Sequence, residues 1–242
     1  MRRFFINPTQ IRGTCGIITD QEARHISTVL RLKSGCAIEL FDGEGQVFQA
    51  EITTINKTTV ETKILGSQFH QETPPFLSLA QALTKGNKMD LIIQKATELG
   101  VTDFWPTISQ HCTVSTASPS QITRWQRIAH ESCKQCDRPN PLLVQAPLSL
   151  PQLWAQSKKF STKIIFLENE TTRILQDIDL HSPERVLLLI GPEGGFSRPE
   201  AEAAIGHDFQ SVSLGPRILR AETAAITAIS ILQFLLGNLQ RK

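Results

Sequence analysis

Two glycine-proline turns in the last quarter of the chain carry the residues that most directly suggest chemistry. The first, Gly191–Gly195 (GPEGG), follows an apolar run at residues 187–190 and precedes an expected helix start at Ser197. The second, at Gly215 and Pro216, follows another stretch that is expected to be a strand. A glycine-rich turn between a strand and a helix presents backbone N–H groups to a ligand. The pattern therefore predicts a ligand-binding loop.

The carboxylate of Glu193 argues against a phosphate as that ligand, because the two negative charges would repel each other. Neither G-x-x-x-x-G-K-[ST] nor G-x-G-x-x-G occurs in the sequence. The turn instead suits an adenine base, a ribose diol or a zwitterionic amino acid. S-adenosylmethionine contains all three, and its sulfonium tolerates a nearby carboxylate. A structural alternative is a capping box formed by Ser197 and Glu200, although it leaves the second turn unexplained.

The elements expected after residue 76 place these turns at one edge of a sheet. Strands are expected at 77–83, 103–108, 163–167, 185–190 and 210–214, and helices at 88–99, 120–136, 150–155, 199–205 and 222–236. Apolar strands that alternate with amphipathic helices predict a parallel sheet covered on both faces. Ligands of such sheets bind beyond the carboxyl ends of the strands, where both turns and the loop at Leu167 and Glu168 fall.

Residues 1–70 have a different pattern, with short alternating runs broken by turn pairs such as Asp42-Gly43. One helix is expected at 20–32, capped by Asp20, with Ala23, Ile26, Val29 and Leu30 on one face. This pattern predicts a small barrel or sandwich. Because Pro74-Pro75 can continue neither a helix nor a strand ladder, the domain boundary is expected there.

Composition sets broad limits on the function. The 242 residues are 40% hydrophobic and 20% charged, with a net charge of +2 that permits a nucleic-acid partner without arguing for one. The run at 224–236 is too short to span a membrane, and the start of the chain does not read as a secretory signal, so no membrane role is expected. The five cysteines suggest a reduced, cytoplasmic protein. Cys133 and Cys136 lack a second ligand pair, so no metal site is expected.

Several stretches resemble the RsmE family of the SPOUT class of methyltransferases. They are LLIGPEGGFS (188–197), VSLGPRILRAETAAITAI (212–229), HISTVLRLKSG (25–35), LFDGEG (40–45), ALTKGNKMDLIIQKATELGV (82–101) and RWQRIAHESCKQCDRP (124–139). The resemblance covers nearly the whole chain. It implies methylation of N3 of a specific uridine in 16S ribosomal RNA, within the small ribosomal subunit, with S-adenosylmethionine as cofactor.

The same resemblance implies a fold and a cofactor site. The fold is α/β, with a PUA-like β-barrel at residues 1–72 that helps to hold RNA and a SPOUT domain with a trefoil knot at 76–242. The protein is expected to act as a homodimer. The implied cofactor-binding residues are Leu167, Glu168, Gly191, Pro192, Glu193, Gly194, Gly195, Leu214, Gly215, Ile218, Leu219 and Arg220.

Arg220 is the first choice for a catalytic residue. Deprotonation of uridine N3 spreads negative charge over O2, N3 and O4, and a guanidinium beside the methyl group could stabilise that charge. The structural alternative for Arg220 is a salt bridge with Glu222 or another carboxylate. Glu193 and Glu222 are candidates for the general base by residue type alone.

Five residues are expected to contact RNA: Arg24, Arg31, Lys85, Lys88 and His111. His111 stands where the family usually has an arginine, which would make its contact weak and dependent on pH. Two alternative functions stay open. One is a related methyltransferase with another RNA target or base atom, and the other is a ribosome-assembly factor that binds RNA without catalysis.

Overall fold

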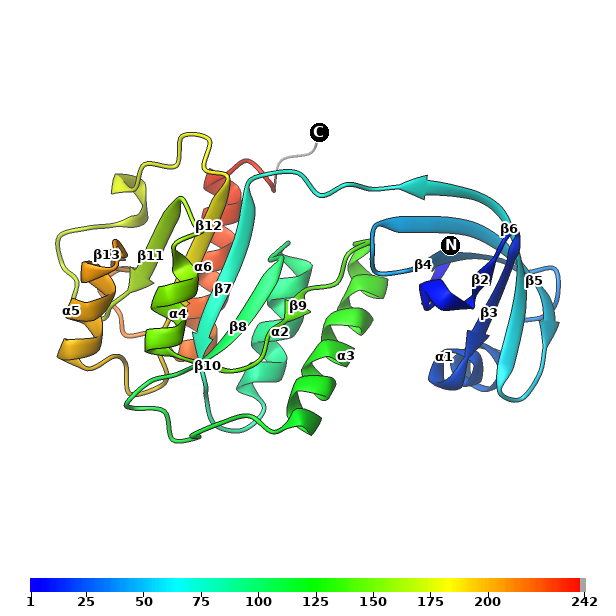
Figure 1. The fold of residues 1–242 in the computed structure, drawn as a ribbon, viewed down its shortest axis with the longest axis horizontal. Coiled ribbons are helices and arrows are strands. Elements are labelled where there is room, and N and C mark those ends of the chain that lie inside the picture. Colours follow the sequence, from blue (N-terminus) through cyan, green and yellow to red (C-terminus); the bar gives the residue numbers. More distant parts are fainter. Residues whose placement is uncertain (240–242) are drawn as a thin grey trace. The chain divides into compact units, whose positions relative to one another are not determined.

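The computed structural model describes residues 1–239 and divides into two compact units (Figure 1). The N-terminal unit comprises Met1–Glu72 and His130–Pro141, and the C-terminal unit comprises Thr73–Ala129 and Leu142–Lys242. The pattern of elements had placed residues 130–141 with the later domain. In the structure Cys133 packs with Phe41 and Val47 of the N-terminal unit, because a long amphipathic helix can bury its end against a different core from its start.

The N-terminal unit is a predominantly antiparallel sheet with the order β1-β4-β5-β6-β3-β2, in which only the β1–β4 pair is parallel among the described strands. Buried and exposed residues alternate along β4, as expected for a sheet with one face on the core. The bounds are β1 Arg2–Phe5, η1 Pro8–Gln10, β2 Ile11–Arg12, β3 Cys15–Thr19, β4 Ala37–Phe41, β5 Gln46–Ile55 and β6 Thr59–Phe69.

The helix expected at 20–32 is shorter and irregular. It consists of α1 (Asp20–Arg24) followed by a π-helical segment, η2 (His25–Val29). Asp20 does not cap it: Thr19 precedes the helix, and Asp20 has a φ of 55°. A π turn holds more residues than an α turn, so later side chains rotate out of register. For this reason Val29 is 69% exposed, although it was expected on the buried face.

The C-terminal unit contains a parallel sheet with the order β10-β8-β7-β12-β11-β13, and β9 pairs with β8. The five expected strands are confirmed within two residues at their ends, and β9 and β10 were not anticipated. The bounds are β7 Phe76–Ala82, β8 Asp103–Ile108, β9 Leu143–Val144, β10 Leu148–Ser149, β11 Thr162–Phe166, β12 Arg185–Ile190 and β13 Gln210–Val212.

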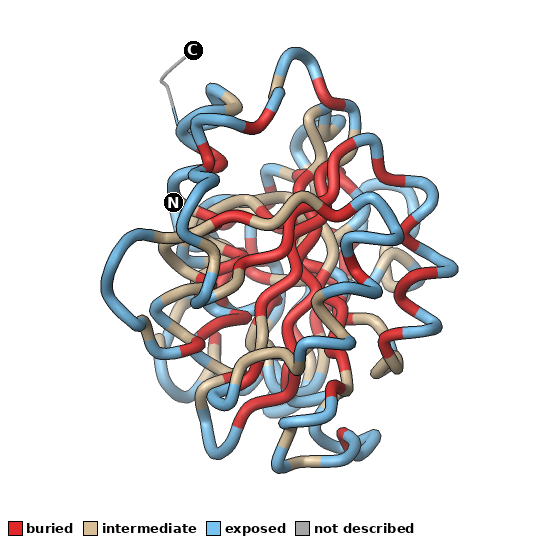
Figure 2. The backbone as a smooth tube through the Cα atoms, turned by 90° about the vertical axis from the view of Figure 1, so that its left-hand side faces the viewer, coloured by how far each residue is buried: buried red, intermediate tan, exposed pale blue. Residues whose placement is uncertain are grey.

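Helices cover both faces of this sheet, as predicted (Figure 1). Along β12, Leu188 packs in the core shared with α2, α3 and α6, whereas Leu187 and Leu189 pack in the core shared with α4 and α5. Figure 2 shows the resulting buried strands running through the middle of the unit. The bounds are α2 Lys88–Glu98, α3 Pro119–Cys136, α4 Leu150–Ser157, η3 Leu175–Asp177, α5 Arg198–Gly206 and α6 Ala221–Leu235.

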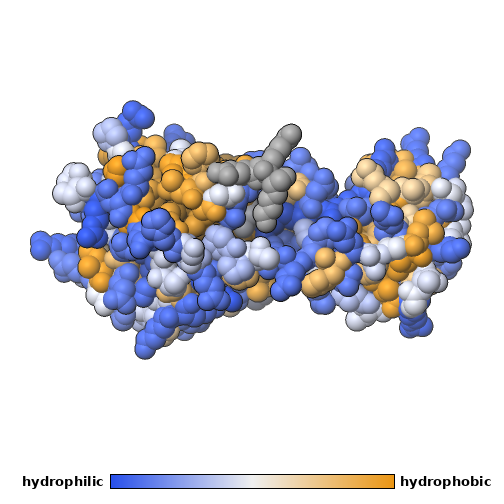
Figure 3. All heavy atoms as spheres, turned by 90° about the horizontal axis from the view of Figure 1, so that it is seen from above, coloured by the Kyte–Doolittle hydropathy of each residue, from blue (hydrophilic) through white to orange (hydrophobic). Residues whose placement is uncertain are grey.

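The surface keeps some large apolar side chains, and apolar atoms are visible on both units (Figure 3). On α6 these are Ile231, Phe234 and Leu235, and on the neighbouring α2 the exposed apolar residue is Leu91. Among the helices of residues 1–239, none is long and apolar enough to cross a membrane.

The cysteines do not form a metal centre in the part of the chain that the structure describes, where no cluster of three or more His, Cys, Asp or Glu could hold an ion. All five are free thiols. Burial raises the pKa of the Cys133 thiol to about 12, so this residue behaves as a small apolar group at neutral pH.

Candidate functional site

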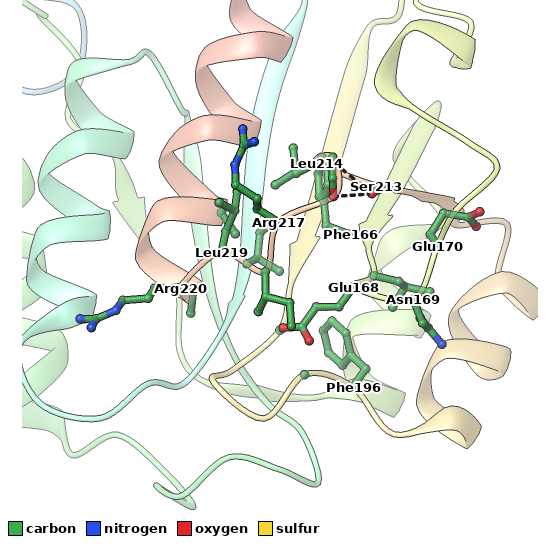
Figure 4. Close-up of a pocket in the computed structure, with 18 of the residues that line it drawn as sticks. Phe166, Glu168, Asn169, Glu170, Phe196, Ser213, Leu214, Arg217, Leu219 and Arg220 are labelled. Carbon is green, nitrogen blue, oxygen red and sulfur yellow. Dashed lines mark hydrogen bonds between the residues drawn. The ribbon is translucent and has the colours of Figure 1, made fainter.

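A cavity of about 900 Å³ lies where β11, β12 and β13 end, at the carboxyl edge of the parallel sheet (Figure 4). This volume is in the range of small-molecule sites. The lining residues are Lys88 and residues 166–171, 174, 190–196, 213–221 and 224. The cavity therefore brings together all twelve residues for which cofactor contact was expected from the sequence.

The conformation of the loop after β12 depends on its glycines. Gly195 has a φ of 65°, a value that favours glycine, and its N–H donates to Pro192 O at 3.0 Å. A Cβ added at Gly191 would lie 3.2 Å from the Phe196 ring, which is tighter than ordinary packing. The expected helix start is confirmed, since Glu200 Oε2 accepts hydrogen bonds from the Ser197 N–H and hydroxyl, both at 2.9 Å.

Side chains and backbone from earlier strands and loops hold this loop from outside the cavity. Gln81 Nε2 donates to Gly191 O at 3.1 Å, and His111 Nδ1 lies 2.9 Å from Gly194 O. Gln81 was not anticipated. Its signal in the sequence is an amide near the end of the mostly apolar stretch FLSLAQA, which forms β7. In the structure this amide is fully buried, and a buried polar group needs a partner, which here is the loop.

One carboxylate oxygen of Glu193 accepts two hydrogen bonds. Its Oε1 accepts from Lys88 Nζ at 2.8 Å and from the Lys85 N–H at 3.1 Å. Burial alone would raise the pKa of Glu193, but the hydrogen bonds from Lys88 and the backbone outweigh it and the pKa lies below its ordinary value. Conversely, the hydrogen bond from Lys88 to Glu193 raises the pKa of the Lys88 ammonium. Both groups are therefore charged at neutral pH, and Glu193 is a poor base.

Glu222 is the second carboxylate beside Lys88. Its Oε2 lies 3.8 Å from Lys88 Nζ, too far for a hydrogen bond, and this buried oxygen has no hydrogen-bond partner within residues 1–239. Lys88, which lines the cavity, therefore lies between the carboxylates of Glu193 and Glu222. The salt bridge between Arg220 and Glu222 that the sequence left open is not among the ion pairs of the described residues.

The loop after β13 is open on the cavity side. Gly215 has a φ of 106°, and its N–H donates to Ser213 Oγ at 3.1 Å. The backbone N–H groups of Ile218 and Leu219 make no hydrogen bond to any other described residue, so both are available to a ligand. Arg220 is the residue that precedes α6, and its side chain points away from Glu168 and Phe196 (Figure 4).

The loop after β11 is fixed by Glu170. Its Oε2 accepts from Ser211 Oγ at 2.6 Å, and its Oε1 accepts from the Thr172 hydroxyl at 2.7 Å and the Thr172 N–H at 2.9 Å. These bonds, led by that from Ser211, lower the pKa of Glu170 to about 2. Glu168 is thereby left at the cavity wall, with its side chain directed toward the loop after β13 (Figure 4).

We expect this loop to loosen in acid. Because the folded pKa of Glu170 lies below the usual 4.5, its contribution to stability is complete above about pH 4.5 and is lost as the pH falls toward 2. Glu170→Gln should therefore lose less thermal stability than the wild type between about pH 6 and about pH 3. The measurement is the melting temperature across that range, with exposed Glu184→Gln as control. Equal acid sensitivity of wild type and Glu170→Gln would contradict the role of Glu170.

The residues expected to contact RNA fall into two groups. Arg24 and Arg31 are exposed on the N-terminal unit, and Arg31 has a φ of 49° just after η2. Lys85, Lys88 and His111 belong to the C-terminal unit. The Lys85 side chain is exposed, whereas the side chains of Lys88 and His111 contact the cavity loop. RNA contact by all five stays a prediction.

Comparison with known proteins identifies the class of protein to which this chain belongs. The sequence model of an RNA methyltransferase domain matches residues 71–233, and that of an RNA methyltransferase PUA domain matches residues 18–65. The two matches define a PUA domain followed by a methyltransferase domain, in agreement with the fold expected from the sequence. The cavity lies wholly within the methyltransferase match, and none of its lining residues falls within the PUA match.

Relatives of nearly equal length show which family of RNA methyltransferases this is. The ribosomal RNA small subunit methyltransferase E of Buchnera aphidicola is 37% identical, over 98% of this chain and 96% of its own. The enzyme of that name from Neisseria gonorrhoeae, solved with S-adenosyl methionine, has a TM-score of 0.88 and 34% identity over 99% and 100% of the two chains. A Legionella pneumophila methyltransferase solved with SAM has a TM-score of 0.89 and 34% identity over 96% and 97%. The chain belongs to the family of ribosomal RNA small subunit methyltransferases E.

Proposed function

We propose that this chain transfers a methyl group from S-adenosylmethionine to N3 of a specific uridine in 16S ribosomal RNA. The observation that carries the proposal is the cavity at the carboxyl ends of β11, β12 and β13, which gathers the three loops expected to hold the cofactor. Family membership over nearly the full length of the chain supports the same reaction class. The compartment that fits this substrate is the cytoplasm.

The cavity fits S-adenosylmethionine in chemistry as well as in size. The free N–H groups of Ile218 and Leu219 can donate to the adenine, whose faces would contact apolar lining side chains. Glu168 can accept from ribose hydroxyls or the ammonium group. The close approach at Gly191 leaves no room for a side chain on the loop that would flank the ligand. When bound, the cofactor supplies an electrophilic methyl group.

The catalytic work that we assign to the protein is positioning and charge stabilisation. Arg220 would stabilise the negative charge that develops on the uracil oxygens. Glu193 accepts hydrogen bonds from Lys85 and Lys88. This leaves Glu222, whose Oε2 accepts no hydrogen bond from the described residues, as the better of the two candidates for accepting the N3 proton.

RNA binding would use cations from each unit. We assign phosphate contacts to Arg24 and Arg31 on the PUA domain and to Lys85 on the methyltransferase domain, all of which are exposed. Lys88 and His111 contact the cavity loop instead of presenting a free charge or ring, so we assign to them a role in shaping that loop.

We further propose a homodimer and a trefoil knot in the segment that forms the three cavity loops. The exposed apolar residues Ile231, Phe234 and Leu235 recur at helical spacing on α6, next to Leu91 of α2, and a second copy of this chain would cover them.

Ile231→Asp is expected to give a monomer. A carboxylate buried in an apolar interface without a partner costs about 3–5 kcal/mol, which exceeds what a marginal dimer can lose. Light scattering coupled to size exclusion at a fixed protein concentration measures the mass. Ile205→Asp on α5, at another exposed apolar position, is the matched control and should leave the mass unchanged. A wild type that is monomeric, or an unchanged mass for Ile231→Asp, would refute the interface.

The function is tested by incubating the protein with labelled S-adenosylmethionine and small ribosomal subunits that lack the modification, followed by nucleoside analysis. We expect 3-methyluridine as the product. A different methylated nucleoside would point to the related methyltransferase with another target. Tight binding of cofactor and RNA without any product, on subunits or on free RNA, would point to the assembly factor.

A further inference from the structure

The peptide unit between Gly194 and Gly195 is the part of the cavity loop that the local sequence constrains least. Neither residue has a Cβ, so this unit can rotate at little steric cost. Its orientation decides whether a carbonyl oxygen or an N–H faces a given side of the loop. The orientation therefore depends on the hydrogen-bond partners of this peptide unit.

Both ends of this peptide unit have a partner. The N–H of Gly195 donates to Pro192 O at 3.0 Å, within the loop. The carbonyl of Gly194 lies 2.9 Å from His111 Nδ1, on the loop between β8 and α3. A carbonyl only accepts, so Nδ1 carries the hydrogen in this contact. Rotation of the peptide would break both bonds at once, and the bond from His111 is the one supplied from outside the loop.

His111 is itself held in place. It lies in a turn closed by the Cys112 N–H and Ser109 O at 3.1 Å. The neighbouring Gln110 N–H donates to Glu200 Oε1 at 2.7 Å, at the start of α5. Gln110 and His111 are therefore both hydrogen-bonded to this region: His111 contacts the turn of the cavity loop, and Gln110 contacts the helix that follows it.

The close approach of His111 to Gly194 also depends on the lack of a side chain at residue 194. A Cβ added at Gly194 would lie 3.1 Å from the His111 Cβ, which is tighter than ordinary packing, so the absence of a side chain at residue 194 favours this close approach. The small size of Gly194 allows His111 to approach the loop. The hydrogen bond from His111 in turn restricts rotation of the Gly194–Gly195 peptide unit.

We propose that His111 is a positioning residue, which fixes the Gly194–Gly195 peptide and so preorganises the loop for the cofactor. The inference rests on the proposed function in one respect, the identity of S-adenosylmethionine as the ligand of this cavity. It differs from the RNA contact expected for His111 from the sequence, because it places the effect of the side chain on the cofactor.

The test compares His111→Leu, which removes the donor, with His111→Asn, whose Nδ2 is separated from Cα by the same number of bonds as Nδ1. His181→Leu, at an exposed histidine of the same unit, is the control. With the full chain, calorimetry gives the Kd for S-adenosylmethionine. We expect His111→Leu to raise it about three- to tenfold, the usual worth of one hydrogen bond, and His111→Asn to restore it.

Hydrogen exchange of the cofactor-free protein supplies a readout that does not depend on methyl transfer. The amide of Gly195 should exchange faster in His111→Leu than in the wild type or His111→Asn, while amides in the strands keep their rates. Unchanged exchange and unchanged Kd in His111→Leu would overturn the inference, as would a loss confined to ribosomal RNA affinity. If the wild type binds no S-adenosylmethionine, the proposed function fails, and the exchange result alone decides the role of His111.

Discussion

Replacing Arg220 with alanine is expected to lower kcat for methyl transfer by about 10²–10³-fold, the effect of removing one preorganised group that stabilises developing charge. Arg220 lines the cavity, yet its side chain points away from Glu168 and Phe196 (Figure 4). This orientation suits contact with the uracil better than contact with the cofactor. The Kd for S-adenosylmethionine should therefore change little in the same variant.

Arg217→Ala is the matched control for this prediction. Arg217 lies on the same loop and also lines the cavity, but its side chain projects to a different side from that of Arg220 (Figure 4). Single-turnover rates and calorimetry on both variants separate chemistry from binding. Equal losses of kcat in the two variants would mean that general positive charge is what matters. A loss that appears only in the Kd of Arg220→Ala would place this residue in cofactor binding.

The strands and helices of the C-terminal unit could be predicted because their signals are local. The apolar run at residues 186–190 forms the end of the expected strand, and the Ser197–Glu200 pair forms the expected helix start. The position of the cavity also follows from local signals, since glycine-rich turns after parallel strands meet at one edge of a sheet. The residues that would hold the cofactor were thus expected at one place, and the structure brings them there.

Contacts between distant segments could not be read in the same way. The partner of His111 is Gly194, which lies 83 residues further along the chain, and no spacing rule connects the two. The π turn at His25–Val29 escaped for a different reason. Its residues fit an ordinary amphipathic helix, and nothing in their local pattern marks the wider turn.

The choice of a general base is a case in which the structure adds to what the sequence could predict. Glu193 and Glu222 were equal candidates for the base by residue type. The structure separates them, because Glu193 accepts two hydrogen bonds while Oε2 of Glu222 accepts none from the described residues. A hydrogen-bonded carboxylate with a lowered pKa is a weaker proton acceptor, and this is a property of the folded arrangement alone.

Gly215→Ala is expected to raise the Kd for S-adenosylmethionine about tenfold or more, through backbone strain and without any clash. No atom lies within 4 Å of a Cβ added there, but the φ of 106° is one that residues other than glycine rarely adopt. Such strain costs about 1–3 kcal/mol. If the loop relaxes to another conformation to avoid the strain, cofactor binding must restore the original one, and each 1.4 kcal/mol of that cost lowers the affinity about tenfold. Because Pro216 follows, the choice of relaxed conformations is narrow.

Gly13→Ala provides a control with strain of the same kind in the N-terminal unit, since Gly13 has a φ of 58° and open space around it. Both variants should melt at a lower temperature than the wild type, and only Gly215→Ala should bind the cofactor more weakly. If Gly215→Ala loses stability while its Kd is unchanged, the affinity for the cofactor does not depend on strain at this position, and the prediction is wrong. If both variants lose affinity, the effect comes from general destabilisation. A loss confined to Gly215→Ala ties affinity to the conformation of this one loop, and through it to the placement of Leu219 and Arg220.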